Sequence, residues 1–363
     1  SGLVFEIIPA LDAATLARFD EIIDVRSPRE FSQDHVPGAV NLPVLGDAER
    51  AMIGTIYVQD SRFKARRLGA ALVSRNIAAH LEGVLAGKPG GWAPLVYCWR
   101  GGQRSNAFAT VIDQVGWRVA VLAGGYRTYR RGVTAALYDA EPDLRLVLLD
   151  GYTGSAKTGI LGRLAARGVQ TLDLEGLADH RGSLFGGFAG RPQPGQKLFE
   201  SRLAGALAAL DPARPIVVEA ESSKVGERMV PPMLWRAMRA APRIDLIAPR
   251  VERARYLVEA YGDIVADPAH VEEVLAKLPG RHGRKRLTEW LEMARAGDVL
   301  ALAESLVEAH YDPAYERSRG REERPRLGLV AVDDLSPASQ ERAAEAIAGL
   351  VHGWAPPPRN PHD

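Results

Sequence analysis

The sequence predicts an α/β protein of two domains, each built on a mainly parallel sheet. The chain has 363 residues, more than one hydrophobic core of ordinary size accommodates. Short apolar runs alternate with helical patterns along most of its length. The alternation stops at Glu141, Pro142 and Asp143 and then starts again. We therefore place the domains at residues 1–140 and 141–352, and we expect the proline-rich tail, residues 353–363, to be disordered.

The first domain shows strand-like runs separated by helical segments. Apolar runs predict strands over residues 21–26, 38–43, 95–98 and 119–122. Helical patterns fill the intervals, over residues 28–32, 55–85, 102–115 and 126–138. Because strands and helices alternate, we expect the strands to pair in parallel.

The second domain repeats this alternation and adds a helical block. Strands are predicted over residues 145–150, 169–173, 215–219, 243–248 and 327–332, and helices after Lys157 and over residues 196–210. The run at residues 145–150 is almost continuously apolar, which suits a strand buried on both faces. Apolar spacings of three and four predict a helical insertion, or lid, over about residues 250–312.

Composition restricts the class of protein without naming a ligand. An apolar content of 46% and a charged content of 25% are ordinary for soluble globular proteins. A formal net charge of +1 requires any polyanion site to be local. A single cysteine excludes an intramolecular disulfide and a multi-cysteine zinc site. The sequence shows no long apolar stretch and no secretory layout, so we expect a cytoplasmic protein that does not associate with membranes.

The single cysteine, Cys98, follows an apolar run and opens a glycine-bearing loop before a helix. Backbone N–H groups of such a loop, the positive end of the helix dipole and nearby arginines favour the thiolate, the nucleophilic form of the side chain. The same groups form a cradle for an anionic donor, with these candidate residues: Arg100, Gly101, Gly102 and Arg104. The alternative is a buried structural cysteine, for which the two arginines and two glycines would have no purpose.

A second loop of similar kind joins the strand ending at Asp150 to a helix. Its pattern is that of a P-loop, in which backbone N–H groups and a lysine hold phosphates while a hydroxyl reaches a metal. The candidate phosphate-binding residues are Gly151, Thr153, Gly154, Ser155, Ala156, Lys157 and Thr158. Ala156 stands where the pattern requires glycine, and its methyl group would crowd a bound phosphate. A glycine-rich turn with a surface lysine is the alternative interpretation.

A metal-binding P-loop needs a carboxylate at the end of a neighbouring strand. Glu219 and Glu221 end the strand predicted at residues 215–219. Side chains two residues apart point to the same side of an extended chain, so the sequence does not choose between these two acidic candidates.

Three segments of the first domain together resemble a rhodanese domain: residues 24–43, the Cys98 loop and residues 122–127. The resemblance implies that Cys98 carries sulfur or selenium, and that His35 belongs to a structural turn. The loop spacing from Cys98 to Arg104 is also Cys-x5-Arg, the signature of phosphatases that form a phosphocysteine. The loop therefore leaves chalcogen transfer and phosphate-ester hydrolysis both open.

The whole chain resembles the bacterial tRNA 2-selenouridine synthases, in which a rhodanese domain precedes a P-loop domain. Further segments carry this resemblance: residues 173–183, 193–200, 219–222 and 310–315. It implies that a tRNA with 2-thiouridine at the wobble position is first geranylated by geranyl diphosphate. Selenophosphate, supplied by a selenophosphate-producing enzyme, then replaces the geranylthio group by selenium. No tightly bound organic cofactor is expected.

The resemblance also assigns roles in the second domain. His180 and Arg181 would face the phosphates, Lys157 would stabilise the leaving diphosphate, and Thr158 with Glu221 would hold a magnesium ion. The helical region at residues 268–310 is our candidate for the groove of the prenyl chain. A kinase fused to a sulfurtransferase or phosphatase is the main alternative, and a catalytically idle nucleotide sensor is another.

Three basic clusters are candidates for tRNA contacts: residues 127–131, 281–286 and 317–321. Arginines beside aromatic residues or glycines suit backbone phosphates and unstacked loop bases. We favour the second cluster, with these residues: Arg281, Arg284, Lys285 and Arg286.

Overall fold

The computed structural model describes residues 5–141, 143–183, 185–188, 190–220, 222–278, 280–319 and 324–354, except the side chain of Arg281. Glu221 and the predicted tail from residue 355 lie outside this range. The chain forms two compact units. The first is Ser1–Asp139 with Gly195–Gly205, and the second is Ala140–Pro194 with Ala206–Asp363. Within the described residues, the helices are too short or too polar to cross a bilayer.

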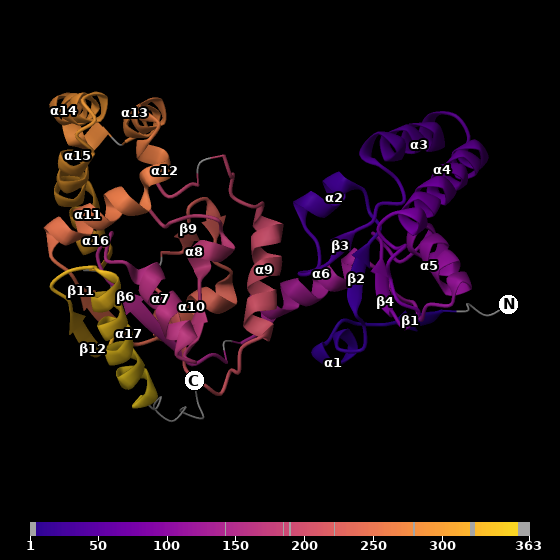
Figure 1. Ribbon diagram of the computed structural model, residues 1–363, viewed down its shortest axis with the longest axis horizontal. Helices are drawn as coiled ribbons and strands as arrows, with labels where there is room; N and C mark the ends of the chain where they lie inside the picture. The colour runs from indigo at the N-terminus through magenta and orange to yellow at the C-terminus, as the bar shows by residue number, and fades with distance from the viewer. Residues whose placement is uncertain are drawn as a thin grey trace. The chain divides into compact units, whose positions relative to one another are not determined.

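A parallel five-stranded sheet with the order β1-β5-β4-β2-β3 forms the centre of the first unit (Figure 1). Its strands are β1 (Glu6–Ile8), β2 (Glu21–Asp24), β3 (Val40–Asn41), β4 (Pro94–Tyr97) and β5 (Ala120–Leu122). Its helices are α1 (Ala13–Leu16), α2 (Pro28–Gln33), α3 (Asp47–Gln59), α4 (Arg62–Glu82), α5 (Gln103–Val115), α6 (Tyr126–Thr134) and the π-helical η1 (Ala135–Asp139). The predicted parallel α/β class is confirmed for this unit.

The helix predicted over residues 55–85 differs in detail from the structure. It is two helices, because Ser61 interrupts the run and caps α4 by accepting from the N–H of Lys64 at 3.3 Å. The first of them also begins earlier, at Asp47. The two helices pack against each other as a helical hairpin, and a short connection at Asp60 and Ser61 joins them.

The second unit contains another parallel five-stranded sheet, with the order β12-β11-β6-β8-β7. Its strands are β6 (Leu146–Asp150), β7 (Gln170–Leu172), β8 (Ile216–Glu219), β11 (Arg243–Ile247) and β12 (Arg326–Ala331). A small antiparallel pair, β9 (Lys224–Val225) and β10 (Arg228–Met229), follows β8. The central strand β6 is buried over Leu146–Leu149, as its continuous apolar run predicts.

Helices cover this sheet and extend beyond it. Those near the sheet are α7 (Lys157–Ala166), α8 (Leu174–Leu177), α10 (Pro232–Ala240) and α17 (Pro337–His352). The predicted helical block consists of α11 (Arg250–Ala260), α12 (Gly262–Val265), α13 (Pro268–Ala276), η2 (Gly280–His282), α14 (Gly283–Arg295), α15 (Val299–Leu306), η3 (Val307–Tyr311) and α16 (Asp312–Arg319). This block has a hydrophobic core of its own around Trp290, Leu275 and Leu306.

The helix α9 (Gln196–Ala208) departs from the predicted domain organisation. Most of it belongs to the first compact unit, although its sequence lies within the predicted second domain. Its buried Glu200 accepts a hydrogen bond from Tyr138 and forms an ion pair with Arg130. A buried carboxylate requires such partners, so Glu200 anchors this stretch of helix to the first unit.

Candidate active site: two anion-binding loops

The Cys98 loop packs backbone against backbone. Gly101 has a φ of +66°, and a Cβ there would lie 2.8 Å from the N atom of Gly124. Gly125 has a φ of +58°, and a Cβ there would overlap the carbonyl oxygen of Cys98. The N–H of Tyr126 donates to that carbonyl oxygen at 2.8 Å. The segment at residues 122–126 therefore fixes the loop, which explains why the sequence pairs these two glycine motifs.

The Cys98 side chain is buried and hydrogen-bonded. Its Sγ lies 3.1 Å from Oγ of Ser105 and accepts from the N–H of Gly102 at 3.3 Å. Burial raises the pKa of this thiol, but hydrogen bonds from Ser105, Gly102 and Arg100 outweigh burial and hold the pKa below its usual value. The helix α5 starts without a side-chain cap, so its N-terminal N–H groups also remain directed at the loop. The arrangement favours a thiolate.

The two arginines of this loop have different surroundings. Arg104 donates to both carboxylate oxygens of Glu30, at 2.8 and 3.4 Å, and Arg50 lies 3.2 Å from the same carboxylate. Arg100 is exposed to solvent. The Glu30 carboxylate orients the Arg104 guanidinium and offsets part of its charge, so Arg100 is the arginine of this loop that is exposed to a donor. The sequence spacing identified Arg104 as a loop residue but could not identify Glu30 as its partner.

The P-loop lies between β6 and α7, and Gly154 and Ala156 both have left-handed backbone conformations. Gly154 has a φ of +85°, and a Cβ there would lie 2.7 Å from the carbonyl oxygen of Arg253. Ala156 has a φ of +58° and is buried. The backbone at residue 156 has the left-handed conformation that glycine adopts easily. For alanine this conformation costs about 1 kcal/mol or more. Lys157 donates from Nζ to the carbonyl oxygen of Gly151 at 2.8 Å.

Two carboxylates lie within hydrogen-bond distance of the hydroxyl of Thr158 in the P-loop. Oγ1 of Thr158 lies 2.8 Å from Glu175 and 3.1 Å from Glu219. Strand pairing explains the second contact, because Glu219 is in register with Leu149 at the end of β6. The sequence reasoning missed Glu175, which the short helix α8 brings back to the loop. Glu221, the other acidic candidate, lies outside the described residues.

The donor set at Thr158 suits magnesium in its chemistry. Magnesium binds hard oxygen ligands, and protein sites often supply only one or two carboxylates while substrate phosphates complete the shell. One hydroxyl and two carboxylates meet that requirement. The described residues contain no cluster of three or more His, Cys, Asp or Glu side chains that could hold a metal, so a metal here would depend on the phosphates.

A cleft of about 890 Å³ opens over the P-loop. His180 and Arg181 line it, as do P-loop residues 153–158. Arg181 donates to Asp263 at 2.8 Å, and its guanidinium lies 4.2 Å from the Phe188 ring and 4.8 Å from the Tyr261 ring. Its Nη1 is buried and has no hydrogen-bond partner within the described part of the chain. Burial and the neighbouring Arg181 lower the pKa of His180, which favours the neutral imidazole.

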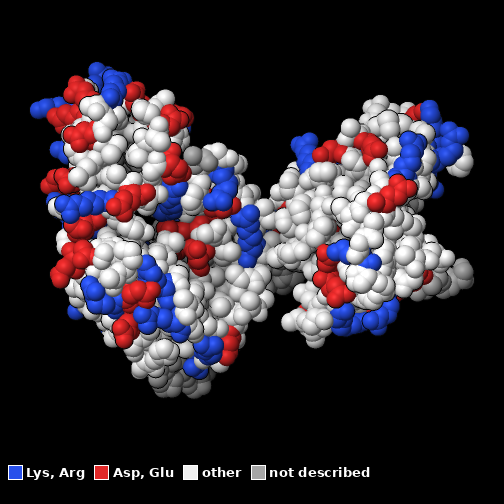
Figure 2. Space-filling view, viewed as in Figure 1, with Lys and Arg blue, Asp and Glu red and all other residues white. Residues whose placement is uncertain are grey.

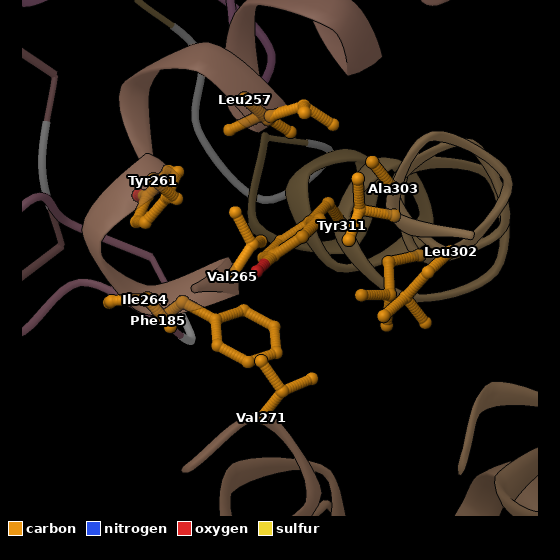
Figure 3. Close-up of a pocket in the computed structure, with 12 residues that line it drawn as sticks. Phe185, Leu257, Tyr261, Ile264, Val265, Val271, Leu302, Ala303 and Tyr311 are labelled. Atoms are coloured by element: carbon orange, nitrogen blue, oxygen red, sulfur yellow. The ribbon is translucent and has the colours of Figure 1, made fainter. Parts of the chain in front are cut away.

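An apolar pocket adjoins this cleft within the helical block (Figure 3). Its volume is about 50 Å³, and its exposed lining is entirely apolar. Three of its residues, Leu257, Tyr261 and Tyr311, also line the cleft over the P-loop. The remaining lining residues are Phe185, Val258, Ile264, Val265, Val271, Val299, Leu302, Ala303 and Leu306. The phosphate cleft and the apolar pocket therefore share a wall.

Comparison with known proteins identifies the family. The model of the tRNA 2-selenouridine synthase AAA domain matches residues 144–292, and the rhodanese-like domain model matches residues 10–131. A tRNA 2-selenouridine synthase of Pseudomonas syringae pv. syringae is 33% identical over 331 residues, which cover 82% of this chain and 88% of the relative. The chain belongs to the tRNA 2-selenouridine synthase family. The predicted resemblance is thus confirmed at the level of family and fold.

Other relatives in the tRNA 2-selenouridine synthase family show similar identity. The protein of Cupriavidus necator is 34% identical over 335 residues, which cover 83% of this chain and 89% of the relative. That of Nitrosomonas europaea is 35% identical over 244 residues, which cover 66% of this chain but only 63% of the relative. Among solved structures, a rhodanese-related protein of Thermoplasma volcanium is 16% identical, with a TM-score of 0.24, and covers 35% of this chain and 93% of its own.

The candidate tRNA residues of this family member lie at the start of α14. Arg284, Lys285 and Arg286 are exposed there, and the side chain of Arg281 is outside the described range. The cluster at residues 317–321 is described only to residue 319. In the cluster at residues 127–131, Arg130 pairs with the buried Glu200, so it serves packing and is unavailable to RNA. A role of the three basic clusters in tRNA binding stays a prediction.

Proposed function

We propose that this protein replaces the sulfur of a wobble 2-thiouridine in tRNA by selenium, in two steps at two sites. The first step is geranylation of that sulfur by geranyl diphosphate. The second is replacement of the geranylthio group by selenium from selenophosphate. The observation that carries the proposal is the wall shared by the P-loop cleft and the apolar pocket. An anionic head and an apolar tail are the two ends of a prenyl diphosphate.

The diphosphate would bind the P-loop of the second unit. N–H groups at the uncapped start of α7 and the Lys157 ammonium supply the positive field. Among the described residues, Lys157 donates to carbonyl oxygens of its own loop, Gly151 and Tyr152, and a phosphate can replace these acceptors at low cost. The Nη1 atom of Arg181, which has no hydrogen-bond partner among the described residues, gives a further donor in the same cleft. These groups stabilise negative charge on the leaving diphosphate as the thiouridine sulfur attacks C1 of the geranyl group.

The geranyl chain would leave the cleft across Leu257 and Tyr261 and end in the apolar pocket. A volume of about 50 Å³ accepts the end of such a chain rather than the whole of it. Its remaining length lies against the shared wall, and burial of each methylene contributes about 0.8 kcal/mol. Five of the twelve lining residues fall within residues 268–310, the region predicted as the prenyl groove: Val271, Val299, Leu302, Ala303 and Leu306.

Magnesium would be held by Thr158 with Glu219 and Glu175. It would supply a further positive charge to the departing diphosphate. Ala156 is compatible with this role, because a diphosphate makes fewer demands on the loop than a nucleoside triphosphate. No nucleotide is part of the proposal.

The second step would use the Cys98 loop of the first unit. The exposed Arg100 and the uncapped N-terminus of α5 attract a small oxyanion such as selenophosphate and orient it beside the thiolate. Attack of the Cys98 thiolate on phosphorus breaks the P–Se bond and releases hydroselenide, which adds to C2 of the geranylated base and expels the geranylthiolate. Water then hydrolyses the phosphocysteine and releases phosphate. A selenophosphate-producing enzyme supplies the donor. Because tRNA is the substrate, we place the reaction in the cytoplasm.

Nucleoside mass analysis tests the proposal. The protein is incubated with 2-thiouridine tRNA and geranyl diphosphate, with or without selenophosphate, and the tRNA is digested. We expect the geranylated nucleoside without selenophosphate and 2-selenouridine with it. An unchanged 2-thiouridine mass under both conditions would remove the proposed function.

A further inference from the structure

The connection between α3 and α4 carries a concentrated positive charge that the two loops do not use. We call Arg62, Phe63, Lys64, Arg66 and Arg67 the hairpin tip. All five side chains are exposed, whereas Ala65 between them is 1% exposed and packs inward. Figure 2 shows Lys and Arg side chains gathered at the upper right, over this connection. The local charge stands out in a chain whose formal net charge is +1.

The placement of these cations is unfavourable for the helix alone. The first turn of α4 contains no acidic residue, and its N-terminus is the positive end of the helix dipole. Arg62 and Arg66 are also four positions apart, where like charges repel. Within the described ranges, Lys64 is the one cation of the hairpin tip with an acidic partner, Asp60 at 2.6 Å in an exposed pair. A polyanion bound at the hairpin tip would offset both penalties.

An exposed aromatic ring lies within this group of cations. Phe63 is 76% exposed and is three and four positions before Arg66 and Arg67, so all three lie on one face of the helix. Arg62 is held over the ring of Tyr57, with 5.5 Å between its Cζ atom and the ring centroid. Guanidinium groups around an exposed ring match the groups that contact phosphates and stack on unpaired bases of RNA.

We propose that the hairpin tip binds the tRNA substrate. Arg62, Arg66 and Arg67 contact backbone phosphates, and Phe63 stacks on a base that is not paired. This inference rests on the proposed tRNA-modifying function and adds a binding surface that shares no residue with either loop. A protein partner fits the tip less well, because its single large apolar side chain is surrounded by cations and lacks the apolar centre of a protein interface.

Binding of labelled 2-thiouridine tRNA to the full-length chain, measured by fluorescence anisotropy over a range of salt concentrations, tests the proposal. One variant combines Arg62→Glu, Arg66→Glu and Arg67→Glu. Its control combines Arg118→Glu, Arg145→Glu and Arg239→Glu, the same change of charge at exposed arginines on separate segments. We expect the first variant to bind roughly 10-fold or more weakly, with a salt slope reduced by about 3. The control keeps the wild-type slope.

Phe63→Ala separates stacking from charge. It should weaken binding by about 5- to 150-fold and leave the salt slope unchanged. Val58→Ser is its control, because Val58 is 81% exposed at the end of α3 and belongs to no part of the tip. Thermal melting of each variant checks that the chain is folded.

Two results would overturn the proposal that the hairpin tip binds tRNA. In one, the tip variants bind tRNA as tightly as their controls. In the other, the wild type binds phosphatidylserine vesicles and the arginine variant loses only that binding, which would assign the tip to a membrane. Neither result bears on the reaction itself. Whether the wild-type protein changes the mass of 2-thiouridine decides the proposed function separately.

Discussion

The Cys98 loop and the P-loop solve a similar local problem in different ways. Each joins a buried parallel strand to a helix that starts without a side-chain cap. In the Cys98 loop, glycine backbones pack so tightly that the buried thiol is 3% exposed, and Arg104 is held by Glu30. In the P-loop, the bonds that Lys157 makes to described residues stay within its own loop, and the loop opens into a cleft of about 890 Å³.

The difference indicates what each loop can do. A close-packed cradle with one activated sulfur suits a small donor and nucleophilic chemistry. An open cradle with a lysine ammonium and an apolar side pocket suits a larger substrate with a leaving group. Two steps that differ in this way can share one chain without competing for residues. The following substitutions test that separation, from the largest expected effect to the smallest.

Cys98→Ser should abolish selenium insertion and retain geranylation. No other residue can replace the thiol, because the chain contains one cysteine. Digestion of tRNA incubated with both co-substrates should then yield the geranylated nucleoside as the end product. If geranylation is also lost while the protein remains folded, the two loops do not act separately.

Lys157→Ala should reduce geranylation by about 100- to 1,000-fold, the usual cost of removing one group that stabilises developing negative charge. Initial rates with 2-thiouridine tRNA and geranyl diphosphate measure the effect. Arg163→Ala is a matched control, because Arg163 lies on the same helix and pairs with Glu341 outside the cleft. Equal rates for the wild type and Lys157→Ala would contradict the role given to the P-loop.

Ser105→Ala should raise the pKa of the Cys98 thiol, because it removes a hydrogen bond to the thiolate. Alkylation by iodoacetamide reports on Cys98 alone, and its rate follows the thiolate fraction. The alkylation rate of both proteins should rise with pH, and the midpoint of that rise should lie at a lower pH in the wild type than in the variant. A superimposable pH profile would show that Ser105 does not activate the thiol. At neutral pH, selenium insertion should slow several-fold.

Ala156→Gly should change the free energy of unfolding by less than about 1 kcal/mol. Glycine relieves the left-handed strain, whereas the lost methyl contact near Ala248 and Leu335 and the greater freedom of the unfolded chain oppose that gain. Urea unfolding measures the balance, and geranylation should stay near the wild-type rate. A large loss of stability would show that the methyl group itself supports the loop.

Much of the fold followed from local pattern. Continuous apolar runs located β4, β6, β8 and β11 to within a residue or two, since such strands are buried on both faces. The helix α17 was not predicted, although Ser336 and Pro337 form an ordinary start signal. The strand β1 has three residues, too few for a periodic pattern, and it depends on pairing with β5.

The site was predictable where it depends on neighbours in sequence and unpredictable where it depends on tertiary contacts. The residues of the two loops could be named from spacing alone. The pairing of Arg104 with Glu30 joins residues 74 positions apart, and the apolar pocket combines five helical elements with Phe185. The placement of α9 on the first unit also depends on a distant partner, Arg130.

The most direct test of two separate sites transfers geranylated tRNA from one variant to the other, since each variant is expected to lack a different step. Cys98→Ser is used to prepare geranylated tRNA, and the purified tRNA is given to Lys157→Ala with selenophosphate and no geranyl diphosphate. Separate sites predict that Lys157→Ala converts the geranylated nucleoside to 2-selenouridine at nearly the wild-type rate. If Lys157→Ala leaves the geranylated nucleoside unchanged while the wild type converts it, the P-loop is required for selenium insertion and the division of work is wrong.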